Sequence, residues 1–233
     1  MAEQNDSAPI LRAERVSRVY GSGENAVHAL RGASLSVYPG QLVALKGRSG
    51  SGKTTLLNLL AALDEPTEGK VYYCGRDLAE LSPGQRDRLR RSEIGLIFQS
   101  FALVPYMSAY ENVEFGLRIA GVPASERKDK AVQALEFVGL KKRMNHRPQE
   151  MSGGEQQRTA IARAIAHRPK IVLADEPTAD LDTRTGLSVI KVFRELVERE
   201  GISIVMTTHD PAIMEIVDIV YALEDGEIVQ HVS

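Results

Sequence analysis

A glycine-rich loop between an apolar segment and a helical one constrains the fold of this chain more than any other feature. The loop Gly47–Thr54 reads Gly-Arg-Ser-Gly-Ser-Gly-Lys-Thr. Before it, Val43–Lys46 predicts a short strand, and after it Lys53–Leu63 predicts a helix with one apolar face. Glycine, four residues, then glycine, lysine and threonine is the spacing at which backbone N–H groups converge on phosphates at a helix N-terminus. A purely structural glycine turn is the alternative, and the complete match disfavours it.

The residues of this loop have distinct expected roles toward a nucleoside triphosphate. Lys53 should reach the β and γ phosphates, and Thr54 should place its hydroxyl on a magnesium ion. Thr55 should assist at the phosphate end. Further nucleotide contacts are expected from the rest of the loop, at Gly47, Ser49, Gly50, Ser51 and Gly52.

Two carboxylates follow a second strand candidate. Ile171–Ala174 is continuously apolar, as a parallel strand covered on both faces should be, and Asp175 and Glu176 come directly after it. A magnesium–nucleotide site needs a carboxylate at the end of a neighbouring strand, so we assign Asp175 to the magnesium ion. Glu176 should face the γ-phosphate and act as the general base that polarises the attacking water. A solvated turn before Pro177 is the structural alternative.

The segment Met151–Arg158 contains a second feature that points to phosphate. Ser152 and Glu155 have the spacing of a helix capping box, and a cap alone is the simplest interpretation. Gly153 and Gly154 between them leave bare backbone N–H groups at a helix N-terminus, which is an anion site. We therefore predict a second phosphate-binding site here.

Strand and helix patterns alternate in the second half of the chain. Ile171–Ala174 and Ile202–Met206 read as strands, and helical stretches precede them at Glu155–His167 and Arg184–Arg199. Alternation of this kind predicts an α/β domain with a mainly parallel sheet. Together with the phosphate loop, it indicates a RecA-like core of the P-loop NTPase class.

The rest of the chain adds a β layer and a helical lobe. Helices are missing between the first two of three short N-terminal strand candidates, so we expect an antiparallel layer from Ile10–Tyr20, Ala33–Val37 and Gly69–Cys74. Helix signals dominate from residue 98 to residue 167, which predicts an inserted lobe. We expect one domain, 1–233, with a nucleotide-binding core at 1–97 and 168–233 and the lobe at 98–167. Asp225-Gly226 predicts a hairpin near the C-terminus.

Composition limits the partners and the compartment. A formal net charge of −2 over 233 residues argues against sequence-independent binding of nucleic acid. Cys74 is the only cysteine and fits a reducing cytosol; we expect it to be a small apolar strand residue. Met1–Pro9 lacks the basic and apolar blocks of a signal peptide, and no apolar run reaches the ~20 residues of a membrane span. Work at a membrane would need a partner that supplies the spans.

Taken together, these motifs resemble the ATP-binding subunit of an ATP-binding cassette (ABC) transporter, and the resemblance covers Ile10 to Val229. Met151–Gln156 resembles the family signature, and Asp175-Glu176 resembles its acidic strand end. Four further features match by position: Gln99 (magnesium-sensing glutamine), His209 (switch histidine at the γ-phosphate), Tyr20 (aromatic residue stacked on adenine) and Ala179–Asp182 (loop that crosses between subunits). Taken alone, Tyr20 and His209 could equally be structural.

The resemblance implies a function. Two copies would meet head to tail around two ATP molecules, each bound with Mg²⁺, so that one chain holds only half-sites. Catalytic roles would fall to Glu176, His209, Gln99 and Lys53. The ion would be held by Thr54, Gln99 and Asp175, and the partner copy would add nucleotide contacts from Ser152, Gly153, Gly154, Glu155 and Asp182. An integral membrane permease would dock on the helical lobe, with no nucleic acid involved, at the cytoplasmic face of the inner membrane.

A narrower resemblance is to the lipoprotein-releasing, macrolide-exporting and antimicrobial-peptide-resistance ATPases, on Phe98–Pro105 and Asn145–Pro148. It implies export or extraction of a lipophilic substrate, lipoprotein, drug or peptide. Phe101, Leu103 and Tyr106 are equally compatible with a docking surface and with lobe core. Asp180 departs from the family, which usually has a small or amide residue there.

Two other classes of protein share part of this pattern. A soluble ABC-type ATPase acting on DNA or ribosomes would carry a long coiled-coil insertion or a second cassette, and Gln99 and Ser152 are too close for the former. A small-molecule kinase or a GTPase switch would have the phosphate loop, but it would not account for Ser152–Gln156.

Overall fold

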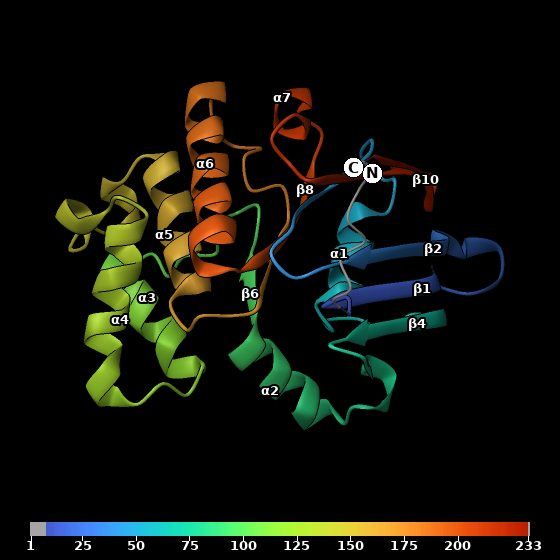
Figure 1. Ribbon diagram of the computed structural model, residues 1–233, viewed down its shortest axis with the longest axis horizontal. Coiled ribbons are helices and arrows are strands. Elements are labelled where there is room, and N and C mark those ends of the chain that lie inside the picture. The colour runs from blue at the N-terminus through green and yellow to red at the C-terminus, as the bar shows by residue number, and fades with distance from the viewer. Residues whose placement is uncertain (1–7, 233) are drawn as a thin grey trace.

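The computed structural model describes residues 8–232 (Figure 1), so most of Met1–Pro9 lies outside the described residues. The strands span Leu11–Tyr20 (β1), Val27–Val37 (β2), Leu42–Lys46 (β3), Glu68–Tyr73 (β4), Arg76–Asp77 (β5), Ile94–Ile97 (β6), Ile171–Ala174 (β7), Ser203–Thr208 (β8), Ile219–Glu224 (β9) and Glu227–Val232 (β10). The helices span Lys53–Leu60 (α1), Pro83–Glu93 (α2), Ala109–Ile119 (α3), Ala124–Phe137 (α4), Gly153–Ile165 (α5), Thr183–Glu200 (α6) and Pro211–Met214 (α7). Short 3-10 turns occur at Gly23–Asn25, Leu78–Glu80, Lys141–Arg143 and Pro148–Glu150.

The central sheet has the order β10-β9-β3-β8-β7-β6. Strands β9, β3, β8, β7 and β6 are parallel, and β10 pairs antiparallel with β9 across the predicted Asp225-Gly226 hairpin. Strand β7 is buried along its whole length, which explains its uninterrupted apolar sequence. Because the carboxyl ends of parallel strands share one edge, the segments after β3, β7 and β8 meet there. That edge carries the phosphate loop, Asp175 and His209.

The predicted antiparallel β layer is present as a second sheet of order β2-β1-β4-β5. Strand β1 pairs antiparallel with both β2 and β4, and β2 starts at Val27, earlier than the sequence suggested. Figure 1 shows this layer on the right, away from α3 to α6. One hydrophobic cluster joins the layer to α1 and to one face of the central sheet, through residues such as Leu11, Leu35 and Leu56.

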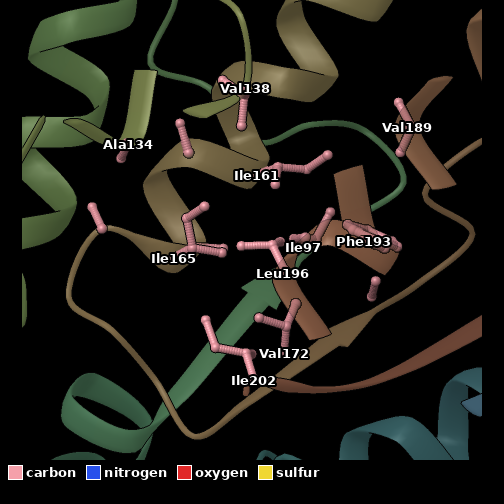
Figure 2. Packing of buried hydrophobic residues seen from close by; sticks show 14 of the residues in the cluster. Ile97, Ala134, Val138, Ile161, Ile165, Val172, Val189, Phe193, Leu196 and Ile202 are labelled. Carbon is pink, nitrogen blue, oxygen red and sulfur yellow. The ribbon is translucent and has the colours of Figure 1, made fainter. Parts of the chain in front are cut away.

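The predicted helical region is also present, since residues 98–167 are all described and contain helices and no strand. A second hydrophobic cluster packs this region against α6 and the other face of the sheet. Figure 2 shows Ile161 and Ile165 of α5 with Phe193 and Leu196 of α6 around Ile97 of β6. The lobe therefore shares its core with α6, and the boundaries at residues 98 and 167 stay a prediction.

Two local expectations differ from the structure. The predicted helix Lys53–Leu63 ends at Leu60, because Ala62 has φ +53° and Leu63 N–H turns back to the Asn58 carbonyl. The prediction for Cys74 was wrong: it is exposed with φ +47° in the turn after β4, where its N–H bonds to Ile10. The residue pattern along β4 does not reveal from sequence that the strand ends before Cys74 and that a turn begins there.

Candidate functional site

The phosphate loop leaves β3 and enters α1 through a tightly packed turn. A Cβ atom at Gly47 would lie 2.4 Å from Ser51 Oγ and 2.5 Å from the Leu223 carbonyl oxygen of β9. At Gly52, where φ is +100°, it would lie 2.5 Å from the carbonyl oxygen of Ala29 in β2. Both positions therefore require glycine, because backbone from two other strands closes against the loop. Sequence spacing predicted the glycines, and the structure supplies this steric reason for them.

Lys53 is buried in the loop, with a relative exposure of 6%. Its ammonium donates to the carbonyl oxygens of Gly47 at 2.9 Å and Arg48 at 3.1 Å, and lies 3.7 Å from Glu176 Oε1. The hydroxyl of Ser51 is buried without a hydrogen-bond partner in the described part of the chain. A buried cation and an unpartnered hydroxyl beside bare N–H groups fit a phosphate.

A cavity of about 550 Å³ opens over this loop. Its wall consists of the first part of the loop, the end of β9 with the following turn, and the switch-histidine position, at Lys46, Gly47, Arg48, Ser49, Gly50, Ser51, His209, Ala222, Leu223, Glu224 and Asp225. The later loop residues Lys53 and Thr54 do not line it. Its volume suits a nucleotide-sized ligand. No residue of α5 lines this cavity.

Asp175 lies at the centre of a hydrogen-bond network at the end of β7. The Thr54 hydroxyl donates to its carboxylate at 3.0 Å, and the Thr207 hydroxyl donates to Oδ1 at 2.7 Å. Thr207 Oγ1 also accepts from the Glu176 N–H at 2.7 Å. The structure therefore brings together the hydroxyl and the carboxylate predicted as magnesium ligands, and both are hard oxygen donors that suit this ion.

Thr207 is the residue at this site that the sequence analysis did not assign. It is fully buried and joins both acidic residues, one through its proton and one through its lone pair. The only sequence signal was its position at the end of a strand, two residues before His209. Position alone does not show that a hydroxyl bridges two neighbouring strands.

Replacing Thr207 with valine should destabilise the protein by about 1–3 kcal/mol, because the N–H of half-buried Glu176 loses its hydrogen-bond partner and the Asp175 carboxylate loses one of its two hydroxyl donors, without a change in side-chain volume. Turnover should fall as well, since Asp175 and Glu176 lose their common anchor. Urea unfolding and a steady-state ATPase assay measure the two effects. An unchanged unfolding free energy would show that the network contributes nothing.

Glu176 has the geometry expected of a general base. Its backbone has φ +42°, and its carboxylate lies near both Lys53 and His209. Glu176 Oε2 is 3.8 Å from His209 Nδ1, and the His209 side chain is 69% exposed. Positive φ at a non-glycine residue costs free energy and is typical of functional positions. The structure thus groups three of the four predicted catalytic residues, and Gln99 is exposed on the segment after β6.

Ser152 caps α5 as predicted. Its hydroxyl accepts from the Glu155 N–H at 3.3 Å, and Glu155 Oε2 accepts from the Ser152 N–H at 2.9 Å. Arg143 donates to the other carboxylate oxygen at 2.9 Å. This ion pair, followed by the Ser152 N–H, lowers the pKa of Glu155 to about 2. The Glu155 carboxylate thus has both of its partners, Arg143 and Ser152, in its own chain. Ser152 is exposed at the helix N-terminus.

Replacing Arg143 with methionine should raise the pKa of Glu155 toward its ordinary value of 4.5. A carboxyl group whose pKa is lowered on folding stabilises the protein above pH 4.5, and that stability is lost as the pH falls toward 2. The variant should therefore be less stable than the parent at neutral pH, and the difference should shrink below pH 4.5. Thermal unfolding of the parent and the variant over this pH range tests the ion pair. A stability difference that did not depend on pH would contradict it.

Tyr20 and Asp182, which the sequence analysis predicts to contact the nucleotide, have partners within this chain. The Tyr20 hydroxyl donates to Asp64 at 2.7 Å, and the Arg18 guanidinium lies 4.6 Å from the centre of its ring. Asp182 caps α6 by accepting from the N–H and the hydroxyl of Thr185. The structure does not bring either to the wall of the phosphate-loop cavity, so their nucleotide contacts stay predictions.

A phosphate loop on a parallel sheet, with an acidic strand end beside it, defines a P-loop nucleoside triphosphatase. The family pattern described as "ABC transporter" matches residues 30–179, so the chain belongs to the ABC transporter family. It is an ATP-binding ATPase subunit of that family, as its sequence resemblance implied. None of the helices within residues 8–232 is long and apolar enough to cross a bilayer.

Individual relatives agree with this membership. The chain is 43% identical to a lipoprotein-releasing system ATP-binding protein LolD of Hahella chejuensis, over 94% of this chain and 95% of that one. It is 43% identical to a macrolide export ATP-binding/permease protein MacB of Syntrophobacter fumaroxidans, over 94% of this chain and 31% of that longer one. The fold matches a dimeric post-hydrolysis structure of the ATP-binding cassette MJ0796 bound to ADP and Pi, with a TM-score of 0.87, 37% identity, and 96% and 98% coverage.

Proposed function

We propose that two copies of this chain hydrolyse ATP as a head-to-tail dimer in which each nucleotide lies between the phosphate loop of one copy and the Ser152 helix start of the other. One observation carries the proposal: the N-terminus of α5, where Ser152 is exposed, does not line the phosphate-loop cavity of its own chain, although a helix N-terminus attracts anions. The MJ0796 cassette with 37% identity is a dimer bound to ADP and Pi, which supports this arrangement.

Magnesium is the ion we propose for the site. The Thr54 hydroxyl and the Asp175 carboxylate, 3.0 Å apart, would hold it together with phosphate oxygens and Gln99. When bound, the ion neutralises charge on the phosphates. No group of three His, Cys, Asp or Glu side chains that could hold a metal alone occurs in residues 8–232, which suits an ion that shares its ligands with the nucleotide.

The chain's own residues would divide the hydrolysis between them. Glu176 accepts a proton from the attacking water, and Lys53 carries the positive charge that the β and γ phosphates require. His209 lines the phosphate-loop cavity and lies beside Glu176, so it can contact the γ-phosphate. Loss of the γ-phosphate removes the group that both copies bind, which lets the dimer open and couples hydrolysis to movement.

We also propose that an integral membrane permease docks on the helical lobe. Phe98 is 41% exposed and Tyr106 is 80% exposed on the segment that leaves β6, which leaves large aromatic surface uncovered. Phe101 and Leu103 of the same segment are half-buried. We propose export or membrane extraction of a lipophilic substrate, lipoprotein, drug or peptide at the cytoplasmic face of the inner membrane. The names of two relatives, a lipoprotein-releasing ATP-binding protein and a macrolide export protein, support the lipoprotein and the drug.

A soluble ATPase that acts on DNA or ribosomes finds no support in the lobe. That alternative predicts a long coiled-coil insertion, whereas the longest lobe helix, Ala124–Phe137, has 14 residues. The short lobe therefore favours the transport subunit.

Replacing Ser152 with aspartate tests the head-to-tail arrangement. Aspartate is as good an N-cap as serine, so α5 should remain intact, but its charge would repel a phosphate bound by the partner copy. We expect ATP binding by the monomer to persist and turnover to fall at least ~10-fold. Ser108→Asp is the matched control, because Ser108 has the same capping box on α3. Equal turnover in the two variants would contradict the proposal.

A further inference from the structure

Arg163 of α5 holds the backbone of the segment that carries Gln99. Its guanidinium donates to the carbonyl oxygen of Phe101 at 2.9 Å and to the carbonyl oxygen of Ala102. Within the described residues it has no carboxylate partner, and burial lowers its pKa. A half-buried charge whose hydrogen bonds go to two consecutive carbonyls serves that backbone rather than an ion pair.

The backbone that Arg163 binds is strained. Phe101 has φ +61° and Ala102 has φ +49°, and neither is glycine. The Phe101 N–H bonds to the Phe98 carbonyl at 3.0 Å, and the Ala102 N–H bonds to the Ser100 carbonyl at 2.6 Å, so a tight turn encloses Gln99. Two successive side-chain-bearing residues in the left-handed region persist only when the surroundings impose that conformation.

Helix α3 makes room for this contact. A Cβ atom at Gly116 would lie 2.8 Å from Arg163 Cγ, so glycine lets the arginine stem pass between α3 and α5. Three parts of the lobe thus meet at the Arg163 side chain: α3 at its stem, α5 that carries it, and the segment after β6 at its guanidinium.

We propose that Arg163 is a positioning residue for hydrolysis, which makes α5 a rigid link between the signature end that binds the partner copy's nucleotide and the Gln99 turn of its own site. Ser152 and Arg163 are eleven residues apart on one helix (163 − 152), about 16 Å along its axis. Movement of Ser152 onto the partner's γ-phosphate therefore shifts the anchor of Gln99. This inference rests on the roles proposed above for Ser152 and Gln99.

Replacing Arg163 with methionine removes both donors and keeps a side chain of similar length. We expect kcat for ATP to fall ~10-fold, because Gln99 loses its fixed position, while KM changes less than ~2-fold. Arg163→Lys keeps the charge but has a single donor centre, and should be intermediate. Arg118→Met, on the exposed side of α3, is the control and should behave as the parent.

Rescue by glycine separates positioning from simple structural damage. Ala102 is exposed, and glycine adopts positive φ without steric cost, so the turn should form without the clamp in Arg163→Met/Ala102→Gly. The double variant should recover at least ~3-fold in kcat over Arg163→Met. A parental kcat in Arg163→Met, no recovery in the double variant, or a rise in KM equal to the loss of kcat would overturn the inference.

The same assays separate this inference from the proposed function. If Gln99→Ala lowers turnover and Arg163→Met does not, only the role of Arg163 fails. If Gln99→Ala leaves turnover unchanged, the role proposed for Gln99 fails first. Retention of the ATP-dependent dimer in Glu176→Gln/Arg163→Met would show that the nucleotide sandwich survives loss of the clamp, as expected.

Discussion

Replacing Glu176 with glutamine should leave ATP bound but lower turnover at least ~100-fold, a barrier increase of nearly 3 kcal/mol. Glutamine has the same shape but cannot accept a proton from water. The backbone N–H bond to Thr207 and the turn at φ +42° should survive, because neither depends on the charge of the side chain. ATP that cannot be hydrolysed should therefore accumulate between two copies as a stable dimer.

Size-exclusion chromatography with and without ATP measures this effect, alongside steady-state turnover. Glu195→Gln is a suitable control, because Glu195 is a half-exposed carboxylate of α6 that pairs with Arg199 of the same helix. A Glu176→Gln protein that stayed monomeric with ATP would refute the nucleotide sandwich. One that retained full turnover would refute the general-base assignment.

Replacing Lys53 with alanine should have a comparably large effect on binding. Lys53 provides the buried positive charge of the loop, and its loss leaves the phosphates with backbone donors alone. We expect the Kd for ATP to rise at least ~100-fold, which corresponds to about 2.7 kcal/mol. Isothermal titration calorimetry measures this, with the exposed Lys191→Ala of α6 as control. Unchanged affinity would mean that the loop does not bind the triphosphate.

Local sequence was enough to predict the elements that carry the site. The predicted strand Ile171–Ala174 is the observed β7, residue for residue, because a strand buried on both faces admits only apolar residues. The predicted capping box at Ser152 is present, since both of its partners lie within one turn. The glycine spacing of the phosphate loop is likewise local.

Contacts between distant segments could not be predicted. Thr207 joins two neighbouring strands through one hydroxyl, and Arg163 binds carbonyl groups that lie about sixty residues earlier in the chain. Neither contact leaves a periodic pattern. The hydrogen bond from Tyr20 to Asp64 could not be predicted either. The family position predicted an aromatic residue at Tyr20 but not its partner in this chain.

The phosphate loop and the N-terminus of α5 lie apart within one chain. The sequence places Gly47–Thr54 and Ser152 in one chain, whereas the cavity over the loop has no wall from α5. We infer that the phosphate loop and the N-terminus of α5 in a single copy serve different nucleotides. This is the central claim, and it predicts that two defective copies can complement each other.

Mixing Lys53→Ala chains with Ser152→Asp chains tests that claim most directly. Each protein alone should have low turnover, because every site lacks either the loop lysine or the signature serine. In a mixed dimer, one site combines the intact loop of the Ser152→Asp chain with the intact Ser152 of the other. Random pairing should restore about a quarter of the parental sites, with turnover highest near equal amounts. Turnover no greater than the sum of the two separate proteins would contradict a site shared between copies.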